Sequence, residues 1–225
     1  MPKPPLERQT PLAPALQTKA QPRQQRALDT YELILGATLE LLSEVGIERL
    51  STNQVCERAG ISPPALYRYF PNKYALLREL GQRLMQAQNE LVETWATPAT
   101  MKLPAKQLTQ NIYGLFDQTR VLTESLPGGL WVTRALRAVP ALSQVRIESH
   151  GYVSGLIVEA FVQAHPLAPR SEVLILARLA VEMNYAALEM LFDDPSLDAK
   201  AAGMALAEML TQQMVAVRRR RAVSG

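Results

Sequence analysis

Residues 50–77 read LSTNQVCERAGISPPALYRYFPNKYALL and carry the start and stop signals of two short helices. Ser51 precedes the first helix, and Gln54 stands at the spacing of a reciprocal N-terminal cap. Gly60 permits a sharp change of direction, and Ser62 before a proline marks the start of the second helix. Two short helices around a three-residue turn that begins with glycine predict a helix-turn-helix.

A longer helix is predicted on each side of this motif. Upstream, apolar side chains recur at every fourth position from Leu33 to Val45, and Gly46 ends the pattern. Downstream, Asn72 is the expected N-cap of a helix that continues to about Ala96. In such a three-helix arrangement the leading half of the second short helix is left free to enter a major groove of DNA.

The remainder of the chain is predicted to be helical, after a linker bracketed by Pro98 and Pro104. We expect five further helices, over residues 105–123, 128–138, 141–164, 171–192 and 198–218. Sustained period-two alternation is missing from the sequence, which argues against a sheet. The predicted fold is therefore all-α, with an N-terminal three-helix helix-turn-helix domain and a C-terminal helical bundle. The expected divisions are a disordered basic arm, the helix-turn-helix domain, the larger helical domain and a basic tail, at residues 1–28, 29–75, 76–218 and 219–225.

The positive charge lies at the two ends of the chain. The formal net charge is +3, but residues 1–28 carry +4 and the arginines from Arg218 to Arg221 carry another +4. Residues 29–217 therefore carry −5. Basic tails of this kind either meet nucleic acid or a membrane surface, or simply keep a protein in solution.

Several classes of protein are disfavoured by the sequence. A single cysteine, Cys56, permits no intrachain disulfide, and a packed, inert thiol is the expectation there. No apolar run reaches the roughly 18 residues of a membrane helix, and the N-terminus shows no secretory signal, so we expect a cytoplasmic protein. His150 is expected on a helix surface and His165 in a loop, and neither has a metal partner at a known spacing. Without a catalytic motif, we expect no enzyme, no cofactor and no metal.

Residues 50–77 resemble the signature of the TetR family of bacterial regulators, most distinctively in the LYRYFPNK run at 66–73. The resemblance implies a sequence-specific DNA-binding transcriptional regulator, a repressor released from a double-stranded DNA operator by a small-molecule ligand. It also implies that the domain over residues 76–218 senses the ligand and forms a homodimer. The alternative is a ligand-independent architectural DNA-binding protein of the same fold.

The resemblance also implies DNA contacts for individual residues. Phosphates would be contacted by the side-chain hydroxyl or ammonium groups of five residues, Ser51, Thr52, Tyr67, Tyr69 and Lys73. Asn53 would reach a base edge or a phosphate, and Arg68 is the candidate for bidentate contact with guanine. The front of the second helix would offer only shape and contact with thymine methyl groups, through Pro63, Pro64 and Ala65.

This sequence departs from the family at the front of that helix. Where Pro64 and Ala65 stand, the family often has a glycine or polar residue and a threonine or serine. Residues 29–75 carry a net charge of −2, so we expect Arg23 and Arg26 of the basic arm to supply part of the attraction to phosphates or to enter the minor groove. Tyr69 and Phe70 are adjacent and cannot share one face of a helix, so at least one is expected to point away from the core.

The last two long helices are the expected dimer interface. By resemblance, their apolar stripes would meet those of a second subunit, although they could equally pack within one subunit; the stripes are Leu176, Ala180, Met183, Ala187 and Leu191, then Ala202, Leu206, Leu210, Met214 and Val217. A ligand cavity is expected within residues 105–164, where aromatic side chains either line it or belong to the core. The candidates are Tyr113, Phe116, Trp131 and Tyr152, with Arg134 to meet an anionic group.

Overall fold

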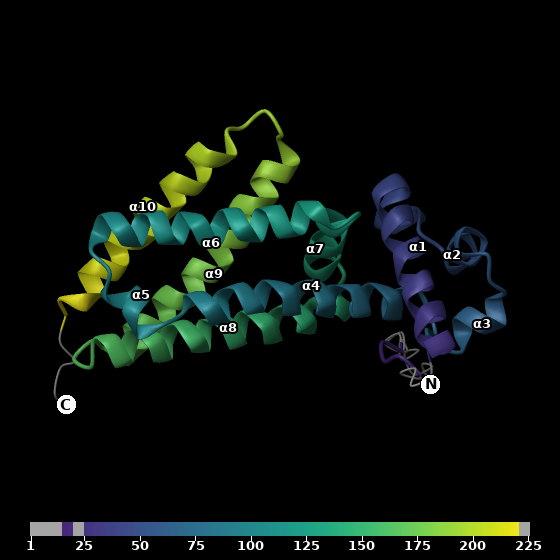
Figure 1. The fold of residues 1–225 in the computed structure, drawn as a ribbon, viewed down its shortest axis with the longest axis horizontal. Helices are drawn as coiled ribbons and strands as arrows, with labels where there is room; N and C mark the ends of the chain where they lie inside the picture. Colours follow the sequence, from purple (N-terminus) through teal and green to yellow (C-terminus); the bar gives the residue numbers. More distant parts are fainter. Residues whose placement is uncertain (1–14, 20–24, 221–225) are drawn as a thin grey trace, which may run out of the picture.

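The computed structural model describes residues 15–19 and 25–220 and contains ten α-helices, one short 3-10 helix and no strand within those ranges (Figure 1). The helices are α1 (Gln25–Arg49), α2 (Thr52–Ala59), α3 (Pro63–Tyr67), α4 (Lys73–Trp95), α5 (Pro98–Lys102), α6 (Ala105–Ser125), α7 (Gly129–Ala138), η1 (Pro140–Leu142), α8 (Ser143–Ala164), α9 (Arg170–Asp193) and α10 (Ala199–Arg218). The prediction of an all-α fold is confirmed. The expectations for Arg23 and Arg221 fall outside the described residues.

The N-terminal domain consists of α1, α2, α3 and the first turns of α4, at one end of the molecule (Figure 1). Its core contains the fully buried side chains Ile34, Leu42, Val55, Leu66 and Phe70. The predicted stripe on α1 is partly wrong, because Leu33 is half exposed. Regular helix geometry in α1 ends at Gly46, as predicted, because this residue has a φ of 71°.

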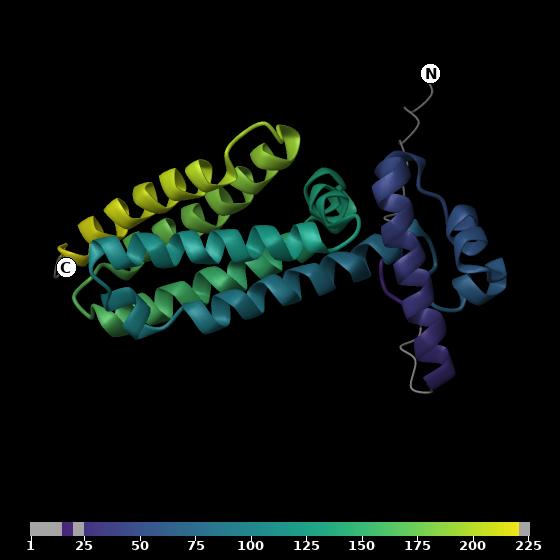
Figure 2. The ribbon, with the colours of Figure 1, turned by 45° about the horizontal axis from the view of Figure 1, so that its top comes forward.

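Helix α4 connects this domain to the bundle without a break (Figure 2). Asn72 caps it as predicted, since its side-chain oxygen accepts from the N–H groups of Tyr74 and Ala75 at 2.9 and 3.0 Å. The first half of the helix buries Leu76, Leu77, Leu80 and Leu84, and the second half packs on α8 and α6. The expected division between residues 75 and 76 therefore falls inside the first turn of a continuous helix.

In the bundle α4, α6 and α8 run roughly along one axis, and α9 and α10 cross them obliquely (Figures 1 and 2). Helix α10 packs closely on α6, because a Cβ atom at Gly203 would lie 2.5 Å from the Phe116 ring. Helix α5 was not predicted, since residues 98–104 were expected to be a linker. Thr97 caps it by accepting from the N–H of Thr100 at 3.1 Å. No helix in the described part of the chain has the length and apolar character needed to cross a membrane.

The two parts of the molecule also touch through α7 and α1. A Cβ atom at Gly46 would lie 3.4 Å from the Trp131 ring, so the indole covers the kink in α1. Gly128, with a φ of 68°, lies directly beside the Leu39 carbonyl, where a Cβ atom would come within 2.6 Å of the oxygen. Both glycines have a positive φ, and in both a neighbouring group lies close to the backbone. The contact between α7 and α1 therefore depends on their lack of a side chain.

Within the arm predicted over residues 1–28, the structure describes residues 15–19 and 25–28, and both segments belong to the N-terminal domain. The Lys19 N–H donates to the Tyr69 carbonyl at 2.8 Å, and the Asn72 side-chain amide donates to the Ala15 carbonyl at 2.9 Å. Residues 15–19 thus lie against the turn after α3, and residues 25–28 belong to α1. Backbone groups make these hydrogen bonds, and the one large apolar side chain of the segment, Leu16, packs against the core.

The structure places one histidine and two arginines of the bundle differently from the prediction. His150 is buried rather than on the surface, with its Nδ1 2.8 Å from a Glu182 carboxylate oxygen. Arg218 and Arg220 do not form a free basic tail. Arg218 donates to the Leu103 carbonyl at 2.9 Å, and Arg220 pairs with Glu172 at 2.6 Å.

Candidate nucleic-acid interface

The turn between α2 and α3 has the geometry that the sequence predicts. Ser51 and Gln54 form the reciprocal cap, with the Ser51 N–H donating to the Gln54 side-chain oxygen at 3.0 Å. Gly60 is left-handed with a φ of 63°, and its N–H donates to the Glu57 carbonyl at 3.2 Å. The helix-turn-helix is therefore confirmed, and its angle is set by the cap and the glycine.

Helix α3 has one buried side and one exposed side. Leu66 is fully buried against the core, whereas Pro63, Pro64, Tyr67 and Arg68 are exposed and the adjacent Ala65 is half buried. Helix α3 begins after Ser62 as predicted and ends at Tyr67. The exposed proline-rich front and the polar end thus form one outward-facing surface.

A hydrogen bond joins the start of α2 to the end of α3 on this surface. The hydroxyls of Thr52 and Tyr67 lie 3.0 Å apart, and 40% of the Tyr67 surface is exposed. Because the pair uses only one proton, one of the two hydroxyls can still donate to a ligand, and both can still accept. Asn53 is exposed next to Thr52. These polar groups lie where the resemblance implies phosphate contacts.

Arg68 is the cation that this surface leaves available among the described residues of the motif. It is exposed, and its guanidinium lies 5.7 Å from the centre of the Tyr69 ring. Arg58, by contrast, is held at 2.7 Å by Glu44 and at 3.2 Å by Glu40, and both carboxylates raise its pKa. Arg49 donates to the Val45 carbonyl at 3.3 Å.

The predicted phosphate contact by Tyr69 is not supported by the structure, because most of the side chain is used inside the protein. The side chain is 4% exposed and meets the Tyr31 ring edge-on, with ring centres 5.7 Å apart. Phe70 is also fully buried, so neither of the two neighbours points away from the core. The helical argument failed because α3 has already ended at Tyr67, and the chain beyond it turns both rings inward.

The predicted phosphate contact by Lys73 is also not supported. Its ammonium donates to three carbonyl oxygens at the end of α1 and beyond, those of Leu50, Ile47 and Glu48, at 3.1, 3.3 and 3.4 Å. A cation at a helix C-terminus satisfies carbonyls that lack helical partners and complements the helix dipole. Lys73 is therefore a structural link between α4 and α1.

Replacing Lys73 by methionine should lower stability without changing how binding to DNA depends on salt. Losing the contacts to the end of α1 should cost about 1 kcal/mol, and about 2–4 °C in Tm for a chain of this size. Thermal melting and a salt titration of DNA binding measure the two effects. The exposed Lys106, replaced in the same way, is the control and should keep the wild-type Tm. If DNA binding by Lys73→Met depended less on salt than binding by the unchanged protein, Lys73 would contact a phosphate after all.

The comparison that decides the family concerns the N-terminal domain. Residues 34–80 match the family described as bacterial regulatory proteins, tetR family. Residues 34–80 thus form a helix-turn-helix domain of the tetR family. The tetracycline repressor protein class C of Escherichia coli is 44% identical over 54 residues, which are 24% of this chain and 25% of that protein. The chain thus matches about a quarter of the length of the tetracycline repressors.

Solved structures extend the likeness in fold to most of the chain. A TetR-family transcriptional regulator from Streptomyces coelicolor has a TM-score of 0.63 at 17% identity, covering 86% of this chain and 88% of that one. SmeT, the repressor of the Stenotrophomonas maltophilia multidrug efflux pump SmeDEF, has a TM-score of 0.63 at 20% identity, covering 80% and 88%. The bundle therefore shares the TetR-family fold.

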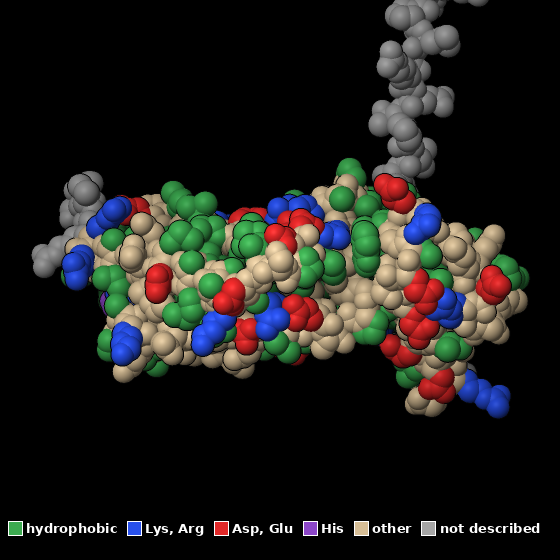
Figure 3. Space-filling model, turned by 90° about the horizontal axis from the view of Figure 1, so that it is seen from above, with side chains coloured by type: hydrophobic (Ala, Val, Ile, Leu, Met, Phe, Trp, Pro, Cys, Tyr) green, Lys and Arg blue, Asp and Glu red, His purple; other side chains and the backbone are tan. Residues whose placement is uncertain are grey.

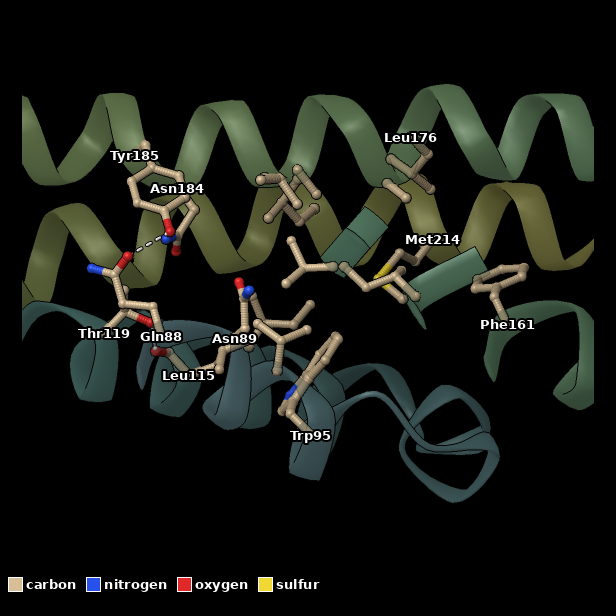
Figure 4. A pocket seen from close by; sticks show the side chains of 18 of the residues that line it. Gln88, Asn89, Trp95, Leu115, Thr119, Phe161, Leu176, Asn184, Tyr185 and Met214 are labelled. Carbon is tan, nitrogen blue, oxygen red and sulfur yellow. Dashed lines mark hydrogen bonds between the residues drawn. The ribbon is translucent and has the colours of Figure 1, made fainter. Parts of the chain in front are cut away.

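The bundle contains a cavity of about 80 Å³ between α4, α6, α8, α9 and α10 (Figure 4). Its lining includes Gln88, Trp95, Asn184, Tyr185 and Met214. None of the five residues predicted to line a ligand cavity is among the side chains around it. The sequence signal that was missed is a run of small and branched residues on α9, which the prediction had assigned to a dimer interface.

The five predicted lining residues have other roles. Phe116 is buried against Gly203 with Tyr113 beside it, so both belong to the contact between α6 and α10. Trp131 covers the kink of α1, and Arg134 stacks over this indole and pairs with Asp193. Tyr152 is half exposed, and its hydroxyl donates to Glu93 at 2.8 Å beside a shallow polar hollow.

The predicted stripes on α9 and α10 face inward. On α10, Leu206, Leu210 and Met214 are buried, and on α9, Leu176 and Ala180 line the cavity. Packing within one subunit, the alternative that the sequence left open, accounts for them. The exposed apolar side chains on these helices are different ones, Leu174, Ile175, Leu179, Met190 and Met209. We call these five residues the outer face. Hydrophobic side chains at the surface of the bundle are visible in Figure 3.

Proposed function

We propose that the chain is a sequence-specific DNA-binding transcriptional regulator, a repressor that a small-molecule ligand releases from its operator. The observation that carries the proposal is the exposed side of α3, where Tyr67 is tied to Thr52 and Arg68 is free of carboxylate partners among the described residues. A helix held on a rigid domain with one polar, cationic side outward suits insertion into a major groove.

The residues divide into two kinds of contact. Thr52 and Tyr67 would hydrogen-bond to phosphate oxygens, which fixes the position of the protein but reads no sequence. The Ser51 hydroxyl already donates to the Gln54 side chain at 2.9 Å, so its predicted role becomes that of the cap of α2. Arg68 would read guanine, and Pro63 and Pro64 at the front of α3 would contact thymine methyl groups or exclude other bases by shape. The acidic balance of the motif implies that part of the attraction to DNA comes from elsewhere.

The basic arm is the proposed source of that attraction. Residues 15–19 lie against the turn after α3, so exposed Lys19 is held on the same domain as the recognition helix, and Arg26 is exposed in the first turn of α1. Each phosphate contact contributes about 0.9 to the slope of log affinity against log salt concentration. Cations of the arm that meet DNA would therefore be visible in that slope.

Glutamine in place of Lys19, Arg23 and Arg26 should reduce the magnitude of the salt slope by about 1–3. Fluorescence anisotropy with labelled DNA over a range of salt concentrations measures it. The control carries glutamine at three exposed lysines of the bundle, Lys102, Lys106 and Lys200. If the arm variant and the control variant both show the wild-type salt slope, the arm makes no contact with phosphates.

We also propose that two copies assemble through the outer face of α9 and α10. A two-fold dimer would present two α3 helices to half-sites about 34–36 Å apart, one turn of DNA. The outer face combines five exposed apolar side chains on neighbouring helices, and such patches on otherwise charged surfaces mark association sites. A second copy fits this surface because an isologous contact needs a self-complementary apolar patch.

The cavity favours the ligand-responsive regulator over the ligand-independent alternative. A ligand that binds more tightly to a bundle geometry unable to span two half-sites would shift the population away from DNA. The direct contact of α7 with α1 offers a mechanical connection between the bundle and the DNA-binding domain. The domain roles follow, with residues 29–75 binding DNA and residues 76–218 sensing the ligand and dimerising.

Footprinting on the DNA upstream of the protein's own coding sequence tests this proposal. We expect a protected region of two half-sites related by two-fold symmetry and weaker protection when a cavity ligand is added. The same protein with alanine at Thr52, Tyr67 and Arg68 is the control and should leave the region unprotected. Equal protection by this variant would contradict the proposed interface.

A further inference from the structure

The side chains that enclose the bundle cavity carry no formal charge. Among the described residues around it are two asparagines, a glutamine, a threonine, a tyrosine and a tryptophan, and the remaining side chains are apolar. Burying a charged group in such surroundings carries a large desolvation cost, which only a partner of opposite charge would offset. Arg134, which the sequence suggested as a partner for an anion, lies outside the cavity and is already paired with Asp193.

The polar side chains gather towards one end of the cavity. Figure 4 shows Gln88, Thr119, Asn184 and Tyr185 together at that end. Gln88 is 2% exposed and is held on both sides, because its amide donates to Thr123 at 2.8 Å and its oxygen accepts from the Tyr185 hydroxyl at 2.7 Å. These bonds fix the wall of the polar end and leave Asn184 as the group that can turn towards a ligand.

The groups that remain available are mostly hydrogen-bond donors. Asn184 makes no side-chain hydrogen bond with any described residue, so its amide is free. Asn89 accepts from the Ser149 hydroxyl at 2.7 Å through its oxygen, which leaves its NH₂ group available. Trp95 also lines the cavity, and its indole N–H is buried with no partner within the described ranges. A ligand would therefore satisfy these groups best with an acceptor oxygen.

The opposite end of the cavity is apolar. Leu176, Met214 and Phe161 lie together there in Figure 4, and α9 adds the small side chains of Ala177 and Ala180. The cavity of about 80 Å³ is smaller than an eight-carbon ligand, so binding requires the lining to expand. Met214 permits this, because a methionine side chain is unbranched and adapts to ligands of different shape. This end suits a hydrocarbon chain or ring with no polar atoms.

We propose that the cavity takes an uncharged amphiphile, a molecule with a hydrocarbon body and one hydrogen-bond-accepting head such as a ketone, ester or amide. The head lies at the Asn184 end, and the body lies between Leu176, Met214 and Phe161. This proposal rests on the proposed function in one respect, namely that the bound molecule is the effector that releases DNA. The cavity itself stands on the geometry of its lining. A carboxylate or an ammonium in place of the neutral head is rejected because the lining offers no counter-charge.

Three probes with the same chain length and different heads test this assignment on the full-length protein without DNA. They are 2-octanone, octanoate and octylammonium, and isothermal titration calorimetry measures their affinities. We expect 2-octanone to bind at least about tenfold more tightly than either ion, since an unpaired charge is the larger penalty. Octanoate or octylammonium binding as tightly as 2-octanone would overturn the proposal.

Two variants locate the binding. Asn184→Leu should weaken 2-octanone by about three- to tenfold, the loss expected for one hydrogen bond. Ala180→Leu should weaken it further by filling the apolar side. Leu167→Ala, at an exposed position away from the cavity, is the control and should not change the affinity. Circular dichroism checks that each variant is folded. Unchanged binding to both cavity variants would place 2-octanone elsewhere and contradict the proposal.

A separate titration on protein bound to DNA keeps the two proposals distinguishable. If 2-octanone binds as expected but leaves the DNA complex intact, the ligand class stands and ligand-dependent release fails. If octanoate binds best and releases DNA, the regulator stands and the neutral ligand class is overturned.

Discussion

Aspartate in place of both Ile175 and Leu179 should convert the protein into a monomer and abolish tight binding to its operator. These residues are 62% and 54% exposed on α9, near the middle of the outer face. In a two-fold dimer each substitution occurs twice, so four carboxylates would be brought together in an apolar contact. Burying unpaired like charges is strongly unfavourable. Operator affinity should fall by about 10²–10⁴, because the second half-site is no longer held at high effective concentration.

Analytical ultracentrifugation and anisotropy on operator DNA measure the two consequences together. The matched control carries aspartate at Val121 and Leu167, which are 49% and 64% exposed on other parts of the bundle. It should remain a dimer and bind DNA like the unchanged protein. A dimer that persists in the Ile175→Asp, Leu179→Asp variant would place the contact between copies on another surface.

Alanine in place of Arg68 should reduce affinity for the operator by about 5- to 150-fold, the range of one bidentate contact with a base. The guanidinium has no carboxylate partner in the described structure, so its removal leaves no buried charge and should not lower the Tm. Affinity for random DNA should fall much less, since only one phosphate-attracting charge is lost. Sequence preference should relax at the base pair that Arg68 contacts.

Competition binding with operator and random DNA separates these effects. Arg170→Ala is the control, because this arginine is also exposed but lies on the bundle and pairs with Glu159. It should bind both kinds of DNA as before. An equal loss of affinity for operator and random DNA in Arg68→Ala would make Arg68 a phosphate contact rather than a base contact.

The helix-turn-helix could be predicted from the sequence because its signals are local. The Ser51–Gln54 cap, the left-handed Gly60 and the Asn72 cap each act within a few residues, and all three have the predicted geometry. Local signals also gave the helices of the bundle to within a few residues. The short helix α5 was missed because Pro98 and Pro104 suggested a linker between them.

Contacts between distant segments could not be predicted in the same way. Tyr69 and Lys73 have the residue types of DNA contacts, yet Tyr31 and the end of α1 use them within the protein. Both depend on how α1 packs across the motif, which no spacing in residues 50–77 encodes. Residues 15–19 are held by two hydrogen bonds of backbone groups and by the single apolar side chain of Leu16, a pattern too sparse to be read from composition.

The bundle shows a second limit of sequence patterns. Helix α9 is apolar on two sides, and a stripe such as Leu176 and Ala180 does not reveal which side meets its own chain. In the structure this stripe lines the cavity, while Ile175 and Leu179, each one position away, are exposed. The predicted interface stripes face inward, and the dimer contact that we propose uses the exposed side of the same two helices. Aromatic residues misled in the same way, because Phe116 and Trp131 fill helix contacts.

Selection of bound sequences from a pool of random double-stranded DNA tests the central claim, that the exposed side of α3 reads DNA in pairs. We expect enrichment of one motif made of two inverted half-sites with centres about one turn, 10–10.5 base pairs, apart. The Arg68→Ala protein should lose preference at one position of each half-site. Recovery of a pool with no enriched sequence, or of single half-sites without symmetry, would contradict the account.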